Sequence, residues 1–403
     1  MKLRHLFYQN KRRGNKVLLC LFGLPVYIKK YDGHHAYYSV CGIRILKKAK
    51  QLVINNINLD SQTLNIAIDL RGGLGDQIIN ANFVYLLRQK IGYDGIRIDI
   101  YEPTDIASAT FKAGDFVDNV YHWQSAEADK YDLCIEIARF PILKNVNKKR
   151  VLHMSPALFE FVLMWIKDNT EKYKFIEENP KLDGMLNKYY LSRGFKRWKQ
   201  FDIENKLGMT ENFPVPMFID IAEHKYLKSL KLPKKFITIH RGVDVRCNAL
   251  SVKQWPIEYY NELIKLIRKK YPDVFIVQLG DSKNRCFEFN GVDLSLIEET
   301  SLEQLKVLLK HSYLHIDGEG GMVHLRHALN GGKSIVLFGP TDPNVYGYSE
   351  NINLVGKGCQ GGCEWVNDHW QECCAMGTPK PFCQYSLTPD IVYRSVDKCL
   401  SNK

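Results

Sequence analysis

The order of hydrophobic and polar positions predicts two blocks in which strands alternate with helices. In the first block, an apolar strand pattern at 64–70 leads into a glycine-rich loop and then a helical pattern at 77–89. Because strands that alternate with helices are typical of parallel sheets, the sequence predicts two α/β domains in tandem. The remaining strand patterns lie at 96–101 and 131–137 in the first block, and at 236–240, 274–279 and 334–338 in the second.

A different pattern separates the two blocks. Residues 154–210 are rich in aromatic side chains and follow a mostly helical periodicity, so we expect a helical insertion there. Pro214 and Pro216 then indicate a linker between the domains. The insertion also carries a basic patch, which consists of Arg193, Lys196, Arg197 and Lys199.

The positive charge of the chain is concentrated at its N-terminus. The 403 residues carry a net charge of +12, and residues 1–50 contribute most of it, with twelve Lys and Arg and one acid, Asp32. The rest of the chain is nearly neutral, which argues against a nucleic-acid groove in its body. The length is sufficient for two domains, each with its own core.

Two interpretations of the basic segment remain open. An apolar run at 17–28 follows several Lys and Arg, as in a signal peptide, but no small-residue cleavage site comes after it. The run is too short, and too interrupted by Gly23 and Pro25, to span a membrane. Related segments at 23–30 and 42–48 alternate apolar and polar residues and predict two short strands. We expect residues 1–50 to bind an anionic membrane surface; a solvated basic tail is the alternative.

The stretch 316–343 contains the most specific pattern of the chain. Gly318, Gly320 and Gly321 allow a close approach of the backbone to a ligand, and a helix that carries His324 follows. Backbone N–H groups at the start of such a helix suit a pyrophosphate, because they point outward at the positive end of the helix dipole. Any glycine-rich turn of an α/β protein would look similar, which is the simpler explanation.

This stretch resembles the donor-binding signature of glycosyltransferase family 9, the bacterial heptosyltransferases. Members typically have an acidic residue, a His-Leu pair a few positions after it, then an apolar strand, and then a Gly-Pro-Thr loop. This chain has Glu319 where Asp is usual. The resemblance covers about residues 64–100 and 236–390. It implies that the donor contacts include Glu319, Gly320, Gly321, His324 and Thr341.

The resemblance implies a GT-B fold, in which two Rossmann-like domains face a central cleft. The expected parts are a basic N-terminal extension (1–62), an N-terminal Rossmann-like acceptor domain with the helical insertion (63–222), a C-terminal nucleotide-sugar-binding domain (233–387) with a Cys-rich loop (359–383), and a C-terminal helix (388–403).

The loop 71–76 opens the first predicted helix and ends in Asp76. It contains part of a dinucleotide fingerprint, but Ile78 replaces the third glycine. It also resembles the Gly-Gly-Leu-Gly-Asn loop of some fucosyltransferases that use GDP-fucose, with Asp76 in place of the Asn. In family 9 the Asp at this position is the proposed catalytic base, a role that suits a carboxylate because an acceptor alcohol must lose its proton. A helix cap is the alternative role, and the two are compatible.

Two cations are candidates for donor phosphate binding. Lys253 precedes a Trp-Pro pair by two residues, as a phosphate-binding Lys does in family 9. Arg241 follows the strand 236–240, at the strand end where α/β sheets bind ligands. Fixed cations and helix N–H groups can stabilise a departing nucleoside diphosphate, so no divalent metal is expected for catalysis. Surface charges are the alternative for both cations, and a structural role is the alternative for His324.

Five of the eleven cysteines occur within residues 359–383. In a cytosolic enzyme, clustered thiols usually indicate a metal, and four thiolates suit zinc or iron. A branch of family 9 that heptosylates autotransporter proteins has a cysteine-held iron, which this cluster loosely resembles. Free buried cysteines are the alternative. The predicted ligands are Cys359, Cys363, Cys373 and Cys383, with Cys373 taken from the adjacent pair that it forms with Cys374.

The resemblance to family 9 therefore implies an inverting glycosyltransferase. The expected donor is ADP-heptose, and the expected acceptor is lipopolysaccharide or another lipid-linked or surface glycan. The expected location is cytoplasmic, peripheral on the inner face of the inner membrane, without a nucleic-acid partner. Two alternatives remain open: a protein heptosyltransferase that acts on autotransporter hydroxyls, and a non-catalytic GT-B protein that binds a nucleotide or glycan.

Overall fold

The chain divides into two compact units, residues 1–59 and residues 60–403. The computed structural model describes five strands between residues 8 and 49, and residues 62–137, 140–178, 189–190, 192–241, 252–281, 287–359, 362–363, 373–374 and 376–401.

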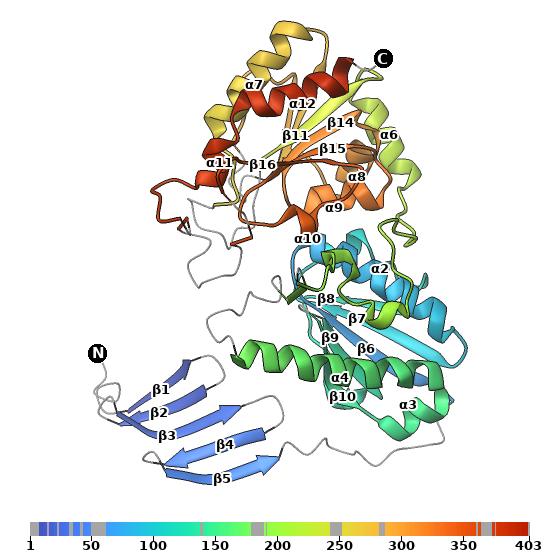
Figure 1. The fold of residues 1–403 in the computed structure, drawn as a ribbon. Coiled ribbons are helices and arrows are strands. Elements are labelled where there is room, and N and C mark those ends of the chain that lie inside the picture. The colour runs from blue at the N-terminus through green and yellow to red at the C-terminus, as the bar shows by residue number, and fades with distance from the viewer. Residues whose placement is uncertain are drawn as a thin grey trace. The chain divides into compact units, whose positions relative to one another are not determined.

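The N-terminal unit contains an antiparallel sheet in which each strand pairs with the next along the chain (Figure 1). The two strands that the sequence predicts correspond to β3 and β5, so the alternating pattern identified them correctly. The neighbouring strands were not predicted. The strands are β1 (Tyr8–Arg13), β2 (Lys16–Leu21), β3 (Leu24–Tyr31), β4 (His35–Val40) and β5 (Ile43–Ala49).

The first half of the second unit is built on a five-stranded sheet in the order β10-β9-β6-β7-β8. Its strands are parallel except β10, which pairs antiparallel with β9. The central strand β6 is buried along most of its length, with Ile66 and Ile68 on one face and Ala67 and Asp69 on the other. The strands are β6 (Leu64–Leu70), β7 (Ile96–Glu102), β8 (Asn119–His122), β9 (Leu133–Ile137) and β10 (Pro141–Val146).

Helices pack against this sheet, and Phe83 of one helix packs edge-on against Trp165 of another. The predicted helical insertion is only partly helical, because 3-10 turns and irregular backbone replace the helix pattern in the described residues after 192. Its long helix lies beneath the sheet in Figure 1. The helices and turns are α2 (Leu74–Ile91), η1 (Ile106–Ala109), η2 (Ala128–Lys130), α3 (Lys148–Met154), α4 (Pro156–Glu178), η3 (Arg197–Lys199) and η4 (Ile203–Asn205).

The second half contains a six-stranded, entirely parallel sheet in the order β13-β12-β11-β14-β15-β16. Every residue of β15 is buried, as expected for a strand that is covered on both faces. The sequence predicts β11, β12 and β15. It did not single out β13, β14 or β16. The strands are β11 (Phe236–His240), β12 (Phe275–Gly280), β13 (Leu294–Ile297), β14 (Leu314–Gly318), β15 (Ser334–Phe338) and β16 (Ile352–Val355).

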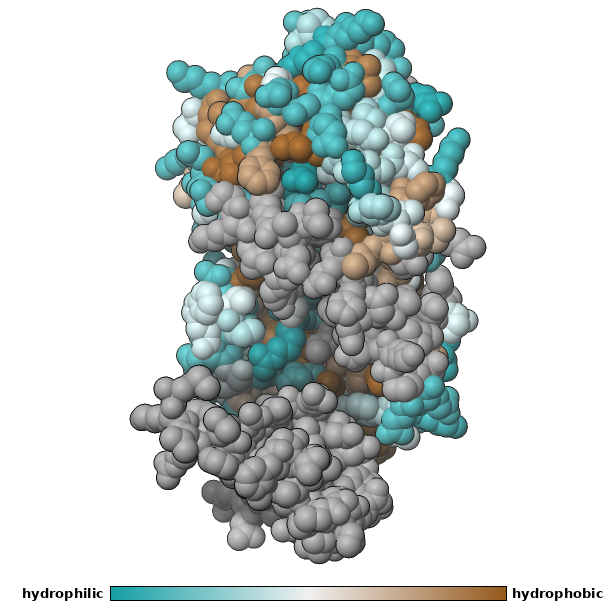
Figure 2. Space-filling view, turned by 90° about the vertical axis from the view of Figure 1, so that its left-hand side faces the viewer, coloured by the Kyte–Doolittle hydropathy of each residue, from teal (hydrophilic) through white to brown (hydrophobic). Residues whose placement is uncertain are grey.

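The helices of this half lie on either side of the sheet, with α7 and α12 together on one side and α8 and α9 on the other (Figure 1). On α7, Tyr260, Leu263, Ile264 and Ile267 form the buried face. On the face that Figure 2 shows, hydrophilic side chains are interspersed with smaller hydrophobic patches. The helices are α6 (Ile221–Ser229), α7 (Ile257–Lys270), α8 (Leu302–His311), α9 (Gly321–Ala328), α10 (Pro343–Tyr346), α11 (Phe382–Ser386) and α12 (Pro389–Ser401).

No helix among the described residues is both long enough and apolar enough to span a membrane.

Candidate active site

Two loops, one from each sheet, contact each other. The first joins β6 to α2, and the second joins β14 to α9. A Cβ on Gly75 would lie 2.5 Å from Cδ2 of His324, and a Cβ on Gly321 would lie 2.8 Å from Cβ of Leu74. Only glycine allows this spacing, because real Cβ atoms essentially never come so close to other heavy atoms. The start of α2 is therefore packed against the predicted donor turn.

Asp76 lies in the first turn of α2 and faces the loop that precedes the helix. Its Oδ2 accepts the backbone N–H of Gly73 at 3.0 Å, so it caps the helix. Gly72 has φ +105°, and a Cβ at this position would overlap the Asp76 side chain. The side chain is still 35% exposed, which leaves room for a substrate beside the carboxylate. Capping and a role as base are thus compatible in this geometry.

Arg197, from the turn η3, forms an ion pair with Asp76. Burial opposes the charge of the guanidinium, but Asp76 outweighs this effect and raises the pKa of Arg197. Nη1 of Arg197 is buried without a hydrogen-bond partner among the described residues. A buried donor in this state costs free energy unless a ligand satisfies it. The sequence indicated Arg197 only as one member of a basic patch.

Glu319 connects the predicted donor residues. Its Oε2 lies 3.3 Å from Nζ of Lys253, and its Oε1 lies 3.4 Å from Nε2 of His324. Burial favours the neutral acid, but Lys253 and His324 outweigh it and lower the pKa of Glu319 to about 2. The structure therefore brings Lys253, Glu319 and His324 together, although 66 residues separate Lys253 from Glu319.

His324 is fixed from its other side as well. Its Nδ1 lies 2.6 Å from the hydroxyl of Tyr348, whose ring also stacks on His327. Burial is the largest of the effects that raise the pKa of Tyr348, so this hydroxyl remains protonated and can donate to His324. No feature of the sequence pointed to Tyr348.

The helix α9 begins beside this cluster without a side-chain cap. Its N-cap residue is Gly320, and a Cβ at Gly320 would point into open space. N–H groups of a first helical turn have no partner within the helix, so an anion can bind them. Both glycines were predicted to let the backbone approach a ligand. In the structure only Gly320 leaves space for a ligand, whereas Gly321 makes room for Leu74.

The segment that carries Lys253 is held on two sides. Nε2 of Gln384 donates to the carbonyl oxygens of Val252 at 3.1 Å and Lys253 at 3.0 Å. Nε of Arg241 donates to the carbonyl oxygen of Trp255 at 2.8 Å. Arg241 thus lies beside the same segment. Gln384 was missed because its partners are distant in the sequence.

Thr341 lies in the loop after β15 and is 1% exposed. In the same loop, a Cβ on Gly339 would overlap the side-chain amide of Gln384. The Gly-Pro-Thr loop is therefore packed against the residue that holds the Lys253 segment.

The cysteines of the C-terminal loop line one cavity of about 410 Å³, next to Val252 and Pro340. Burial is the main cause that raises the pKa of the Cys383 thiol to about 12, and the thiols of Cys359 and Cys363 add to it. Within the described part of the chain, no three His, Cys, Asp or Glu side chains have positions that could hold a metal ion. The cysteines are gathered but not arranged for coordination, so the metal site stays a prediction. The cavity-lining cysteines are Cys359, Cys363, Cys373, Cys374 and Cys383.

Comparison with known proteins identifies a family for part of the chain. Residues 216–368 match the model of glycosyltransferase family 9 (heptosyltransferase). No curated protein matches the chain. The ADP-heptose lps heptosyltransferase II of E. coli is 14% identical, with a TM-score of 0.50 over 84% of this chain and 98% of that chain.

Two further solved structures share the fold. A family 9 glycosyltransferase from Veillonella parvula is 13% identical, with a TM-score of 0.51 over 85% of this chain and 99% of that chain. The iron-containing dodecameric glycosyltransferase TibC from enterotoxigenic E. coli is 11% identical, with a TM-score of 0.52 over 98% of this chain and 95% of that chain. The predicted fold of two Rossmann-like α/β domains and the resemblance to family 9 are confirmed.

Proposed function

We propose that this chain, a glycosyltransferase with a family 9 match over residues 216–368, transfers heptose from ADP-heptose to a lipopolysaccharide or related surface glycan, with inversion at the anomeric carbon. The observation that carries the proposal is the contact between the start of α2 and the turn before α9. In this contact Gly75, the residue directly before Asp76, lies against His324, which supports a role for Asp76 beside the donor turn.

In the proposed reaction, Asp76 acts as the base. The acceptor hydroxyl gives its proton to the carboxylate while its oxygen forms a bond to the anomeric carbon. The N–H of Gly73 and the guanidinium of Arg197 hold the carboxylate in place. The bond between the anomeric carbon and the donor phosphate oxygen breaks in the same step, and its electron pair leaves with the nucleoside diphosphate.

The departing diphosphate carries developing negative charge. Lys253 and the uncapped N-terminus of α9 would stabilise it, with Arg241 and Thr341 as further contacts. Glu319 and His324 position this diphosphate-binding site. Glu319 contacts both His324 and Lys253, and so fixes the ammonium group of Lys253 at one side of the turn. Preorganised charges of this kind favour the transition state without a divalent metal.

The proposed donor is supported by the family match and by a structure of similar fold. TibC, 10% identical with a TM-score of 0.53, has been solved in complex with ADP-D-beta-D-heptose. The decisive experiment incubates the protein with ADP-heptose, UDP-glucose and GDP-fucose and measures the release of each nucleoside diphosphate. We expect release from ADP-heptose only. Tight binding of a donor without any release, with or without glycan acceptors, would instead favour the non-catalytic alternative.

The cysteine-lined cavity favours a second acceptor class. We propose a protein heptosyltransferase as the alternative function, because the loop gathers five cysteines next to the donor loop and the fold resembles that of an iron-containing glycosyltransferase. Comparing transfer to a deacylated lipopolysaccharide core with transfer to an unfolded autotransporter fragment separates the two.

The cysteine loop is proposed to bind one zinc or iron ion through four thiolates, and binding would draw together thiols that the structure gathers without a coordinating arrangement. Cys359, Cys363 and Cys383 remain the proposed ligands, with Cys374 as a better fourth than Cys373 because Cys373 is exposed. We expect elemental analysis of protein purified without chelator to give one metal ion per chain. Cys359→Ser should remove the metal, whereas Cys399→Ser, outside the cavity, should not. A metal content far below stoichiometry, with titratable thiols in the loop, would leave the cysteines as ordinary free thiols.

The basic N-terminal unit is proposed to dock on an anionic membrane surface at the cytoplasmic side. Removal of residues 1–59 takes away +11 of the +12 net charge but removes no residue of the three hydrophobic clusters described in residues 60–403. We expect the truncated protein to bind ADP as the full chain does. Its association with anionic lipid vesicles should fall, by about 1 kcal/mol for each Lys or Arg that lay near the surface. Neutral vesicles are the control, and equal binding of both proteins to anionic vesicles would contradict the docking role.

A further inference from the structure

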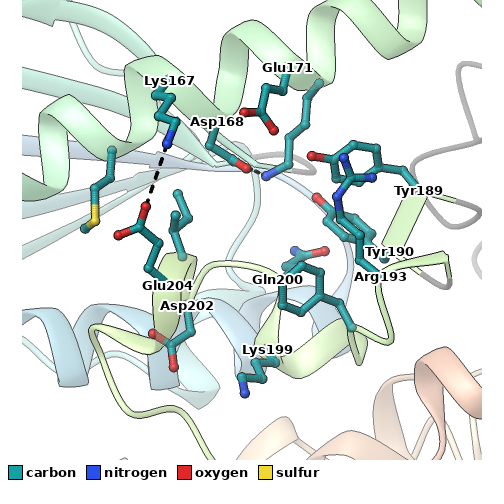
Figure 3. A pocket seen from close by; sticks show the side chains of 14 residues that line it. Lys167, Asp168, Glu171, Tyr189, Tyr190, Arg193, Lys199, Gln200, Asp202 and Glu204 are labelled. Carbon is teal, nitrogen blue, oxygen red and sulfur yellow. Dashed lines mark hydrogen bonds and ion pairs between the residues drawn. The ribbon is translucent and has the colours of Figure 1, made fainter.

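A second cavity, of about 440 Å³, lies between α4 and the segment 189–204 (Figure 3). All its lining residues belong to 164–204, so it is separate from the donor turn at 319–324. Its volume is within the range of small-molecule sites. The proposed reaction does not use it.

The walls of the cavity are preorganised. Lys172 is 1% exposed, forms an ion pair with Asp168, and lies 5.4 Å from the ring centroid of Phe140 and 5.5 Å from that of Tyr190. The guanidinium of Arg193 lies 3.6 Å from the ring centroid of Tyr189. Burial lowers the pKa of Lys172, with Asp168 opposing it. Burying an ammonium group is costly, so this arrangement needs a reason beyond packing.

One polar group inside the cavity has no partner. The side chain of Gln200 is almost fully buried, and its Nε2 makes no hydrogen bond to the described residues. In Figure 3 its amide lies among the other labelled side chains of the cavity. A buried amide donor without a partner destabilises the fold unless a ligand accepts its hydrogen bond.

The chemistry of the lining favours a carbohydrate. Four Lys or Arg side chains face four Asp or Glu side chains, so the cavity has no net charge for a phosphate or another strong anion to neutralise. Tyr189, Tyr190 and Phe195 offer aromatic surface to the C–H face of a sugar ring. Carboxylates and an amide around such rings can bond to hydroxyl groups. A lipid chain is disfavoured because too much of the lining is ionic.

A short segment, residues 195–200, connects the cavity to the proposed base Asp76. Phe195, Lys199 and Gln200 line the cavity, while Arg197, between them in the sequence, reaches Asp76. A ligand in the cavity would thus contact the same turn that orients the carboxylate. We infer that this cavity binds a saccharide unit of the acceptor, an inference that rests on the proposed glycosyl transfer.

The test measures saccharide binding directly and needs no turnover. Saturation-transfer NMR with the full chain uses maltotriose, mannotriose and chitotriose at millimolar concentration as probes. We expect at least one of them to bind. Gln200→Leu should weaken that binding about tenfold or more, through loss of the amide hydrogen bond and of its polar surroundings. The melting temperature should stay equal or rise, because Nε2 of this amide makes no hydrogen bond to the described residues.

Glu171→Gln is a second variant at the exposed mouth of the cavity, and Glu177→Gln, on the same helix outside it, is the matched control. Binding that weakens in Gln200→Leu and Glu171→Gln but not in Glu177→Gln supports the inference. Failure of the parent to bind all three saccharides, or equal binding by all four proteins, overturns it. ADP binding is measured in parallel by calorimetry, so that loss of the proposed donor function is detected separately from loss of the saccharide site.

Discussion

Replacing Asp76 by Asn is expected to lower the rate of sugar transfer by about 10²–10⁴-fold, the usual contribution of a general base. Asn has nearly the same shape and can still accept the N–H of Gly73, so α2 should keep its cap. It cannot take the acceptor proton. Donor affinity, measured by calorimetry with ADP, should change little, because Asp76 is not among the proposed donor contacts.

Arg197→Lys provides the control for this prediction. It keeps a positive charge beside Asp76 but loses the planar guanidinium, so we expect a smaller fall in rate than for Asp76→Asn. Equal melting temperatures of parent and Asp76→Asn would confirm that the fold is intact. If Asp76→Asn transferred sugar within a factor of about three of the parent, the assignment of the base would be wrong.

Replacing Lys253 by Ala is expected to weaken nucleoside diphosphate binding by about 1.5–3 kcal/mol, the range for a hydrogen bond to a charged group. The change also leaves Glu319 buried beside His324 without its ammonium partner. Such an uncompensated charge destabilises the fold. The double variant Lys253→Met with Glu319→Gln removes both charges, so it should recover stability while ADP binding stays weak. Unchanged affinity for every nucleotide in Lys253→Ala would refute the phosphate contact.

The same pair predicts how stability depends on pH. Glu319 has a pKa near 2 in the folded chain and an ordinary value of 4.5, so its contribution is fully present above about pH 4.5. It is lost as the pH falls from there towards 2. The double variant lacks this carboxylate, and urea unfolding should show a weaker loss of stability over that range than the parent shows.

The sequence was sufficient for the parts of the fold that local pattern encodes. Apolar runs predicted the strands β6, β11, β12 and β15, because buried parallel strands are nearly continuous in hydrophobic residues. Strands β8 and β16 were not singled out, since they are short and only partly buried. Asp76 and the turn 319–324 could be found because each opens a helix with a local signature.

Only the tertiary structure decided how these local parts form a site. Arg197 pairs with Asp76 across 121 positions, and Gln384 holds Lys253 across 131, distances at which a single sequence carries no pairing signal. Gly321 was predicted to face the ligand, but its lack of a Cβ, together with that of Gly75, lets two helix starts touch. The local pattern of apolar and polar residues reflects how stable a segment is as a strand or a helix. The positions of charges and buried hydrogen-bond donors relative to one another depend instead on which elements pack together.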